Sequence, residues 1–180
     1  MSLKQGISLT IRNVVVALTF GVLFASTNAL AAQGPDGLVA MNVETYNKVD
    51  QRELICLATN IYHEAGGESN KGKAAVAHVT LNRTNSPLYP SKICGVVYQK
   101  TGRACQFSWT CDRRPNSVPH KDRNRSWKDS LHIAMLVLEG IVKDPTHGAL
   151  FFHEKSVKTG WGRHFVRTAF IGNHVFYKRG

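Results

Sequence analysis

The sequence predicts an α+β fold, in which a set of helices precedes a small antiparallel β-sheet near the C-terminus. Apolar residues recur at helical spacing up to about residue 143, and short aromatic runs follow them. Two of these runs, residues 168–171 and 174–177, flank Gly172-Asn173, a pair that favours a two-residue hairpin turn. With 180 residues, 43% of them hydrophobic, the chain is long enough for one domain with a buried core, which excludes a wholly disordered protein.

The first predicted helix has the clearest boundaries. Asp50 and Glu53 resemble a capping box at its start, and Gly66-Gly67 ends it. The apolar residues between these points recur at helical spacing, at Leu54, Leu57, Ala58, Ile61, Tyr62 and Ala65. They form one side of the helix, which we expect to pack in the core.

Further helical segments and one long loop are predicted before the sheet. Ser69 caps a second helix that extends to residue 82, and a short third element covers residues 91–97. Residues 105–124 are polar and contain two prolines, which indicates a surface loop. A fourth helix is expected over about residues 126–143. Its predicted apolar face consists of Trp127, Leu131, Ala134, Met135, Leu138, Ile141 and Val142.

The predicted sheet consists of a short aromatic strand over residues 149–153 and the hairpin that follows it. A two-residue turn would place Thr168 opposite Tyr177 on one face of the hairpin and His174 on the other face. Only one of these faces can look into a cleft.

The N-terminal residues have the pattern of a secretory signal peptide. Lys4 and Arg12 precede an apolar run over residues 14–24, and Ala29-Leu30-Ala31 provides a small-residue cleavage site. The run is shorter than the about 20 residues that a membrane span needs, although an uncleaved anchor is the alternative. We therefore expect residues 1–31 to be removed on export to the periplasm or the extracellular envelope, with no stable membrane span afterwards.

The excess of basic residues indicates an anionic partner. The chain has 23 Lys and Arg against 12 Asp and Glu, a net charge of +11, which falls to +9 when Lys4 and Arg12 leave with the signal peptide. Export argues against nucleic acid as this partner and in favour of acidic envelope polymers. Residues 32–49 are predicted to be a linker or loosely ordered arm, and residues 50–180 the folded domain.

The cysteines are even in number, which in an exported protein indicates two disulfides. A zinc site is the alternative, but the sequence contains no C-x-x-C pair. Three pairings are possible and the sequence does not select one; a local bridge would pin the loop between its two cysteines. The four residues are Cys56, Cys94, Cys105 and Cys111.

Glu64 is the strongest candidate for chemistry, because it lies in the last helical turn before Gly66-Gly67. The partial negative charge of a helix C-terminus disfavours the carboxylate and raises its pKa, as a general acid requires. The alternative is a solvated surface carboxylate. Glu68 lies just ahead of the second helix, where a negative charge is favourable, and is a possible supporting partner of Glu64.

No metal and no cofactor are expected. His63-Glu64 begins like the H-E-x-x-H zinc motif, but the second histidine is replaced by Gly67. The other histidines show no metal-ligand spacing. A cysteine nucleophile is disfavoured because paired cysteines carry no thiolate.

Several motifs together resemble the SleB/CwlJ family of cell wall hydrolases. Residues 64–68 read Glu-Ala-Gly-Gly-Glu, residues 72–83 read GKAAVAHVTLNR, residues 107–108 are Phe-Ser, and residues 171–177 read IGNHVFY. The resemblance covers about residues 54–178. Each motif is weak alone, and their combination is specific.

The resemblance implies a lysozyme-like catalytic domain that cleaves the glycan strands of peptidoglycan, with Glu64 as the catalytic residue of the family's E-A-x-G-E motif. It favours a lytic transglycosylase, which cleaves between N-acetylmuramic acid and N-acetylglucosamine and forms a 1,6-anhydromuramoyl product. A hydrolytic muramidase and a non-catalytic basic envelope-binding module are the alternatives. Gly66 stands where many relatives have Arg, so the electrostatics near Glu64 can differ.

We expect a monomer whose partner is peptidoglycan. The candidate substrate-binding residues come from the Cys105–Cys111 loop, the hairpin and their surroundings. For the aromatic ones, packing in the core or the sheet is the alternative. The candidates are Glu68, Phe107, Ser108, Trp161, Thr168, His174 and Tyr177.

Overall fold

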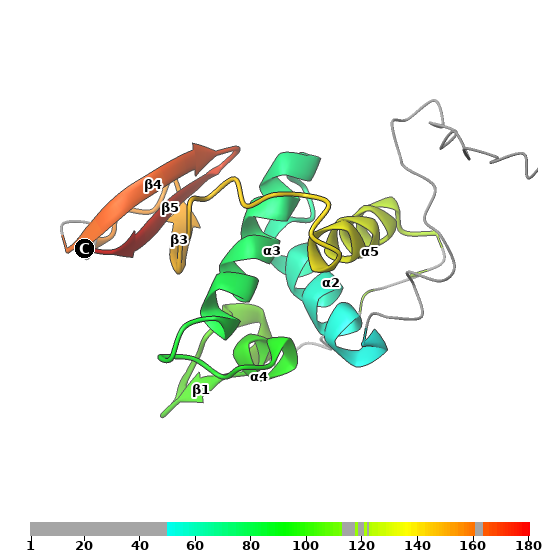
Figure 1. Ribbon diagram of the computed structural model, residues 1–180, viewed down its shortest axis with the longest axis horizontal. Coiled ribbons are helices and arrows are strands. Elements are labelled where there is room, and N and C mark those ends of the chain that lie inside the picture. The colour runs from blue at the N-terminus through cyan, green and yellow to red at the C-terminus, as the bar shows by residue number, and fades with distance from the viewer. Residues whose placement is uncertain (1–49, 113–117, 119–120, 122, 161–163) are drawn as a thin grey trace, which may run out of the picture. The chain divides into compact units, whose positions relative to one another are not determined.

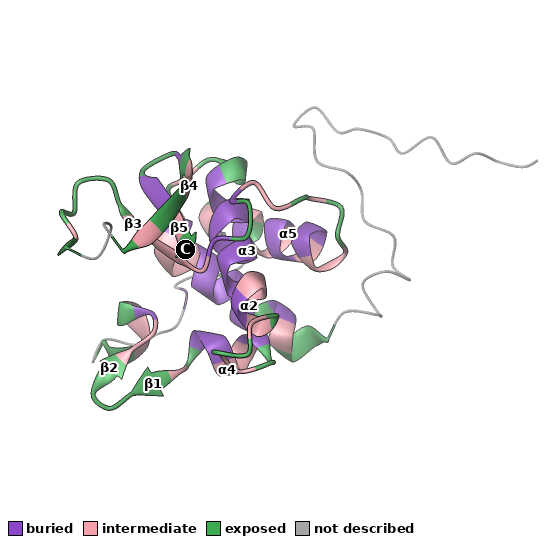
Figure 2. Ribbon diagram, turned by 60° about the vertical axis from the view of Figure 1, so that its left-hand side comes forward, coloured by how far each residue is buried: buried purple, intermediate pink, exposed green. Residues whose placement is uncertain are grey.

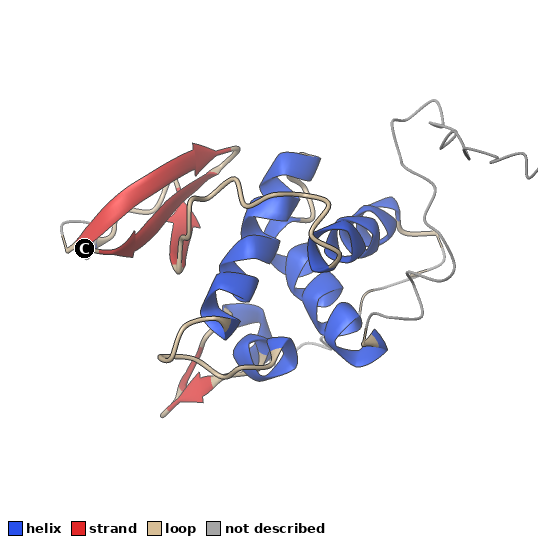
Figure 3. Ribbon diagram, viewed as in Figure 1, coloured by secondary structure: helices blue, strands red, loops and turns tan. Residues whose placement is uncertain are grey.

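The computed structural model describes residues 50–112, 118, 121, 123–160 and 164–180. The predicted signal peptide (residues 1–31) and linker (residues 32–49) lie outside the described residues, as does Trp161. The boundaries of these segments stay predictions. The described part has a helical body followed by a small sheet, which confirms the predicted α+β class (Figures 1 and 3).

The described residues form four α-helices and one 3-10 helix. These are α2 (Gln51–Ala65), α3 (Asn70–Thr84), α4 (Ile93–Val97), η1 (Ser108–Cys111) and α5 (Arg125–Leu138). Asp50 caps α2 and Ser69 caps α3, each accepting hydrogen bonds from backbone N–H groups of the first turn, as predicted. In this described part, no helix is long and apolar enough to cross a membrane.

Helix α2 is central to the helical body, because it contacts α3, α4 and α5. Leu54, Leu57 and Ile61 of α2 are at most 1% exposed, and they belong to one core with Ile133 and Val137 of α5. Figure 2 shows that buried residues are concentrated in α2, α3 and α5. The core therefore fixes the position of the end of α2.

The capping box predicted at Asp50 and Glu53 is half wrong. The Asp50 side chain caps α2, but the Glu53 carboxylate turns away and accepts hydrogen bonds from Ile93 N and Cys94 N at the start of α4. A carboxylate is favourable at that helix start because the first N–H groups of a helix have no partner within it. Glu53 thus ties α4 to α2.

The fourth predicted helix ends earlier than expected, at Leu138 rather than near residue 143. Gly140 has φ +69°, and its N–H donates to Val137 O at 3.0 Å, which closes the last turn. Ile141, predicted on the apolar face, is 55% exposed as a result. The rest of the predicted face is confirmed, because Trp127 and Ala134 are buried and Leu131, Met135, Leu138 and Val142 pack against the core. The buried positions that the prediction left out are Ser130, Ile133, Leu136 and Val137.

The loop predicted over residues 105–124 is not wholly on the surface. Its start forms the second strand of a short hairpin of β1 (Lys100–Thr101) and β2 (Ala104–Cys105), and η1 follows. Phe107 is 3% exposed and Val118 is 5% exposed, and both belong to the helical core. The expectation of a polar surface loop is therefore wrong at these two apolar residues.

The C-terminal sheet contains β3 (Phe151–Glu154), β4 (Phe165–Ile171) and β5 (His174–Arg179) in the antiparallel order β3-β5-β4. The Gly172-Asn173 hairpin is confirmed, with Gly172 at φ +60°. Ile171 and Phe176 pack on Ala75 and Val79 of α3. One face of the sheet is thereby attached to the helical body.

The predicted pairing of Thr168 with Tyr177 is wrong. A register shift between Arg167 and Ala169 leaves Thr168 out of the pairing, so that Tyr177 faces Arg167. Such a bulge inserts one residue into one strand and cannot be read from turn length alone. His174 and Tyr177 do lie on opposite faces, because they are separated by three positions of a strand.

Two disulfides link the cysteines, Cys56 to Cys94 and Cys105 to Cys111, and none of the four cysteines is free. The first bridge joins α2 to α4, the same two helices that the hydrogen bonds of Glu53 connect. The second closes the short loop that contains η1. Of the three pairings that the sequence left open, the structure has the one with the local bridge.

Loss of the two bridges should cost unequal amounts of stability. Replacing both members of Cys56–Cys94 with Ala is expected to lower the free energy of unfolding by about 4 kcal/mol, and Cys105–Cys111 by about 2 kcal/mol, because loop-closure entropy grows with separations of 38 and 6 residues. Urea denaturation measures both values. A larger loss from the local bridge would contradict this order, and two or more free thiols in the native protein would contradict the pairing.

Candidate active site

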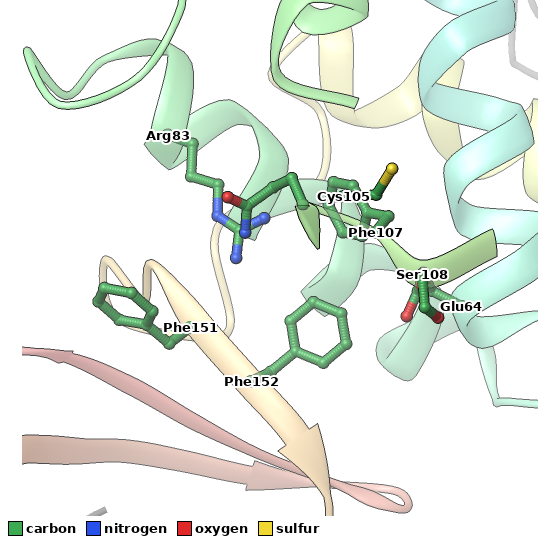
Figure 4. A pocket seen from close by; sticks show the side chains of 8 residues that line it. Glu64, Arg83, Cys105, Phe107, Ser108, Phe151 and Phe152 are labelled. Atoms are coloured by element: carbon green, nitrogen blue, oxygen red, sulfur yellow. The ribbon is translucent and has the colours of Figure 1, made fainter. Parts of the chain in front are cut away.

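A pocket of about 450 Å³ lies between the end of α2, the end of α3, the start of the η1 loop and strand β3. This volume is typical of small-molecule sites. In Figure 4, Glu64 and Ser108 lie toward one end of the pocket and Arg83 toward the other. The lining residues are Glu64, Arg83, Cys105, Gln106, Phe107, Ser108, Phe151 and Phe152.

Glu64 projects into this pocket from the last turn of α2 and is partly buried. Ser126 Oγ of α5 donates to Gly66 O at 2.7 Å, which holds the end of α2 in place. Burial raises the pKa of Glu64 to about 7, and the positive charge of Arg83 opposes that rise. The direction agrees with the prediction, although burial and not the helix terminus is the main cause. Near neutral pH the carboxyl group can therefore both donate and accept a proton.

Arg83 is the charged residue of the pocket that sequence reasoning did not assign to the site. It is only 4% exposed, and its Nε donates to Leu150 O at 2.8 Å. Its guanidinium lies over the rings of Tyr89 (5.4 Å) and Phe107 (5.1 Å). Burial lowers the pKa of Arg83, while Tyr89 and Glu64 favour its charged form.

A signal for Arg83 was present in the sequence. The buried residues of α3 include Val76, Val79 and Thr80, and Arg83 follows them at the same helical spacing. A charged residue that continues an apolar helix face is buried with partners or has a function. This pattern indicates a buried arginine but does not show which pocket it faces.

The η1 loop is held rigidly beside Glu64. Trp109 Nε1 donates to Asn60 Oδ1 at 3.0 Å, and the Trp109 ring stacks on His63 with centroids 4.4 Å apart. Asn60 is fully buried, and its Nδ2 donates to Thr80 Oγ1 at 3.2 Å. This network links α2 and α3 to the loop that carries Phe107 and Ser108. Trp109 accordingly has a packing role.

Strand β3 forms the opposite wall with two aromatic rings that the sequence did not connect to the site. The Phe152 ring contacts His174 edge-on, with centroids 5.2 Å apart, and lies 5.8 Å from Phe176 on the inner face of the sheet. Phe151 is on the outer face, since side chains alternate along a strand. Because β3 is an edge strand, residues from both faces of the sheet, Phe151 and Phe152, line the pocket.

Of the predicted substrate-binding residues, Phe107 and Ser108 line the pocket with Glu64. Glu68 instead faces the hairpin turn, where its Oε2 accepts a hydrogen bond from Asn173 N at 3.4 Å. A side chain at Gly172 would collide with the Glu68 carboxylate, and one at Gly72 would lie 2.8 Å from Glu68 Cβ. Glu68 thus fits closely between α3 and the sheet.

The three hairpin candidates are not among the residues that line the pocket. His174 is 8% exposed and lies behind Phe152. The Tyr177 hydroxyl is 3.1 Å from His153 Nε2 on the outer face. Thr168 lies at the bulge. Direct substrate contact by these residues, and by Trp161 outside the described part, stays a prediction.

In the described part of the chain, no group of three or more His, Cys, Asp or Glu residues is placed to hold a metal ion. Among the described residues that line the pocket, Glu64 is also the only acid. What the pocket does provide is a carboxyl group of raised pKa near a buried guanidinium, which is suited to proton transfer.

The helical body and the small antiparallel sheet form a lysozyme-like α+β domain. The chain belongs to the cell wall hydrolase family, whose model matches residues 67–177. Glu64 lies shortly before the matched residues.

Curated relatives carry the name spore cortex-lytic enzyme. The protein of Bacillus subtilis (strain 168) is 28% identical over 152 residues, which are 83% of this chain and 41% of that protein. The protein of Halalkalibacterium halodurans is 31% identical over 127 residues, which are 69% of this chain and 34% of that protein. The chain therefore matches less than half the length of these relatives.

Two solved structures are similar in fold. The catalytic domain of the germination-specific lytic transglycosylase SleB from Bacillus anthracis has a TM-score of 0.56 and 27% identity, and the match covers 73% of this chain and 98% of that one. The catalytic domain of the Bacillus cereus SleB protein has a TM-score of 0.56 and 26% identity, covering 77% and 99%. The similarity spans nearly all of each catalytic domain.

Burial of Glu64 should destabilise the folded protein as the pH rises. Its pKa in the folded protein, about 7, exceeds the ordinary 4.5, so this group's contribution to stability is lost between these two pH values as the carboxyl ionises. Glu64→Gln removes this penalty and is expected to be about 1 to 3 kcal/mol more stable than the parent near pH 8, but about equal near pH 4. Urea denaturation at both pH values measures the difference. Equal stability at both would show that the carboxyl group is solvated.

Arg83 should limit how far the pKa of Glu64 rises. Arg83→Gln is expected to raise that pKa further, because the positive charge that favours the carboxylate is lost. Arg83→Lys keeps the charge and is the matched control, with a pKa closer to that of the parent. An NMR titration of the Glu64 side-chain carboxyl carbon gives all three values. A lower pKa in Arg83→Gln would contradict the assigned interaction.

Proposed function

We propose that this protein cleaves the glycan strands of peptidoglycan between N-acetylmuramic acid and N-acetylglucosamine as a lytic transglycosylase, with Glu64 as the single catalytic acid and base. The observation that carries the proposal is a carboxyl group with a pKa near 7 in a pocket whose described lining contains no second acid. The names of the relatives, spore cortex-lytic enzymes and a lytic transglycosylase, support the same reaction class.

In the first step, protonated Glu64 donates its proton to the glycosidic oxygen. The bond from that oxygen to C1 of the muramoyl residue breaks, and its electron pair stays on the departing N-acetylglucosamine oxygen. Positive charge then develops at C1 and its ring oxygen. Glu64 is left as a carboxylate on the same side of the pocket, where Arg83 favours its charged form.

In the second step, the Glu64 carboxylate accepts the proton of the muramoyl 6-hydroxyl. The 6-oxygen forms a bond to C1, which closes a 1,6-anhydro ring and restores protonated Glu64. No water is consumed, so the reaction requires one carboxyl group that both donates and accepts a proton. A pKa near 7 suits both tasks at neutral pH.

A hydrolytic muramidase would usually employ a second carboxylate to activate water or to form a covalent intermediate. The same bond is then broken, but the product carries a reducing muramoyl end. A non-catalytic envelope-binding module would account for the charge but not for a buried carboxyl group in the pocket.

We also propose that the protein acts outside the cytoplasm, as a monomer on peptidoglycan. The signal-peptide pattern of residues 1–31 supports export, as do two disulfides, which form in oxidising compartments. The net charge, +11 for the full chain and +9 without Lys4 and Arg12, suits a polymer with acidic peptide stems. Within the site, Phe107 and Ser108 are proposed to contact the sugar next to Glu64, and Glu68 to position the sheet.

Glu64→Gln should fold and lose at least about 10² to 10⁴-fold of the turnover on peptidoglycan, because Gln keeps the size of the side chain but has no transferable proton. Release of soluble fragments from purified peptidoglycan measures turnover, and mass spectrometry identifies their ends. The parent should release 1,6-anhydromuramoyl products.

Glu68→Gln is the matched control and should keep more activity, since Glu68 faces the hairpin turn and not the pocket. Reducing muramoyl ends in the parent digest would replace the transglycosylase mechanism by the hydrolytic one. A folded Glu64→Gln protein with near-parental turnover would refute the assignment of Glu64.

A further inference from the structure

The C-terminal sheet has a second face, opposite the one that packs on α3. The register places Phe151, His153 and Tyr177 on the side opposite Phe152 and Phe176, because strand side chains alternate. The partner positions on β4 place Arg167 and Phe170 on the same side. We call this side the outer sheet face. It carries the aromatic side chains of Phe151, His153, Phe165, Phe170 and Tyr177, the cations Arg167 and Arg179, and the buried Val175.

Aromatic rings are arranged in pairs over this face. The rings of Phe151 and Phe165 have centroids 4.5 Å apart, and His153 stacks on Tyr177 at 5.4 Å with an interplanar angle of 19°. Phe170 is 61% exposed, the highest value among the large apolar side chains in the described part of the chain. The rings of the two pairs are half-buried, and Phe170 is the exposed ring of this face. An exposed aromatic side chain beside half-buried rings offers a binding surface, and flat rings fit the apolar faces of sugar rings.

The outer sheet face is continuous with the pocket, because Phe151 belongs to both. From Phe151 a row of paired positions crosses the sheet through Tyr177 on β5 to Arg167 on β4. With strands about 4.8 Å apart, this row is roughly 10 Å long. A polymer that leaves the pocket over the edge strand β3 would meet this row next.

The charge of this region fits an acidic polymer. The sequence contains no Asp or Glu after Glu154, whereas Arg167, Lys178 and Arg179 all lie in the strands. Arg167 is exposed and pairs with Tyr177 in the row. Glu154 lies on the inner face, since it pairs with His174. On the outer sheet face the described charged residues are Arg167 and Arg179, with no acid, whereas Lys178 lies on the inner face.

We propose that the outer sheet face is a second binding surface for the glycan strand, beyond the cleavage pocket. Phe170 and the ring pairs contact sugar rings, and Arg167 pairs with carboxylates of the peptide stems. The identity of this occupant rests on the proposed function, since the same polymer that enters the pocket would continue onto the sheet.

Binding is tested in the full chain carrying Glu64→Gln, so that the polymer stays intact. Phe170→Ser and Arg167→Gln should each weaken sedimentation with insoluble peptidoglycan at least about fivefold. Ile141→Ser, at a side chain 55% exposed in the segment after α5, and Arg125→Gln, whose side chain is 85% exposed, are the matched controls and should bind as the parent does. Thermal unfolding checks that all variants remain folded.

Two further measurements distinguish the contribution of the aromatic rings to binding from that of the Arg167 charge. On insoluble peptidoglycan whose peptide-stem carboxylates have been converted to amides, Arg167→Gln should bind like the parent, whereas Phe170→Ser should still bind weakly. In the active protein, both variants should be slower on intact strands but not on soluble fragments short enough to fill only the pocket.

Unchanged binding by Phe170→Ser and Arg167→Gln would overturn the inference, as would equal losses in the control variants. A change of oligomeric state in Phe170→Ser, seen by light scattering, would mark the face as a contact between copies and also overturn it. The products of digestion and the turnover of Glu64→Gln test the proposed function. The sedimentation of the sheet variants tests only the outer sheet face, so failure of one proposal can be told from failure of the other.

Discussion

The burial of the Glu64 carboxyl group is the constraint on which the rest of the site depends. A solvated glutamate is ionised at neutral pH and has no proton to give. Raising its pKa from 4.5 to about 7 requires that water be replaced by protein on several sides at once. Four segments line the pocket around it, namely the end of α2, the end of α3, the residues from Cys105 to the start of η1, and strand β3. Ionisation of Glu64 in this environment lowers the stability of the folded protein. Interactions elsewhere in the protein must therefore hold these segments in place.

Arg83 contacts several of these segments, and its positive charge limits how far the pKa of Glu64 rises. Its hydrogen bond to Leu150 O reaches the chain just before β3, and its guanidinium packs on the Phe107 ring of the η1 loop. A neutral residue could pack there, but it would leave the carboxylate of Glu64 without a favourable charge. A carboxyl group that must donate a proton and then accept one needs both forms to be accessible. Burial favours the acid and Arg83 favours the carboxylate, and the pKa reflects both.

The sequence predicted what local signals encode and missed what depends on distant contacts. The caps at Asp50 and Ser69, the glycine break after Ala65 and the Gly172 turn act within a few residues, and all were predicted correctly. Glu53 was assigned a local partner because its partners at α4 lie far away in the chain. The bulge at Thr168 and the position of Phe152 opposite Glu64 likewise arise from tertiary packing. Glu64 itself was recognisable because its unusual place at a helix end is a local feature.

Glu68 connects the C-terminal sheet to the segment that carries Glu64. Glu68 follows Glu64 across the short turn between α2 and α3, and its carboxylate is seated against Gly172 and Asn173. Lys73 Nζ donates to Glu68 O at 2.6 Å, which fixes the turn from the other side. Because neither Gly72 nor Gly172 has a side chain, the hairpin can approach α3 closely enough for Phe176 to pack on Ala75. Phe152 pairs with Phe176, so this close approach also sets the distance between Phe152 and the pocket carboxyl group. The two glutamates of the motif are therefore placed differently, since Glu64 lines the pocket with a raised pKa and Glu68 is seated between α3 and the hairpin turn.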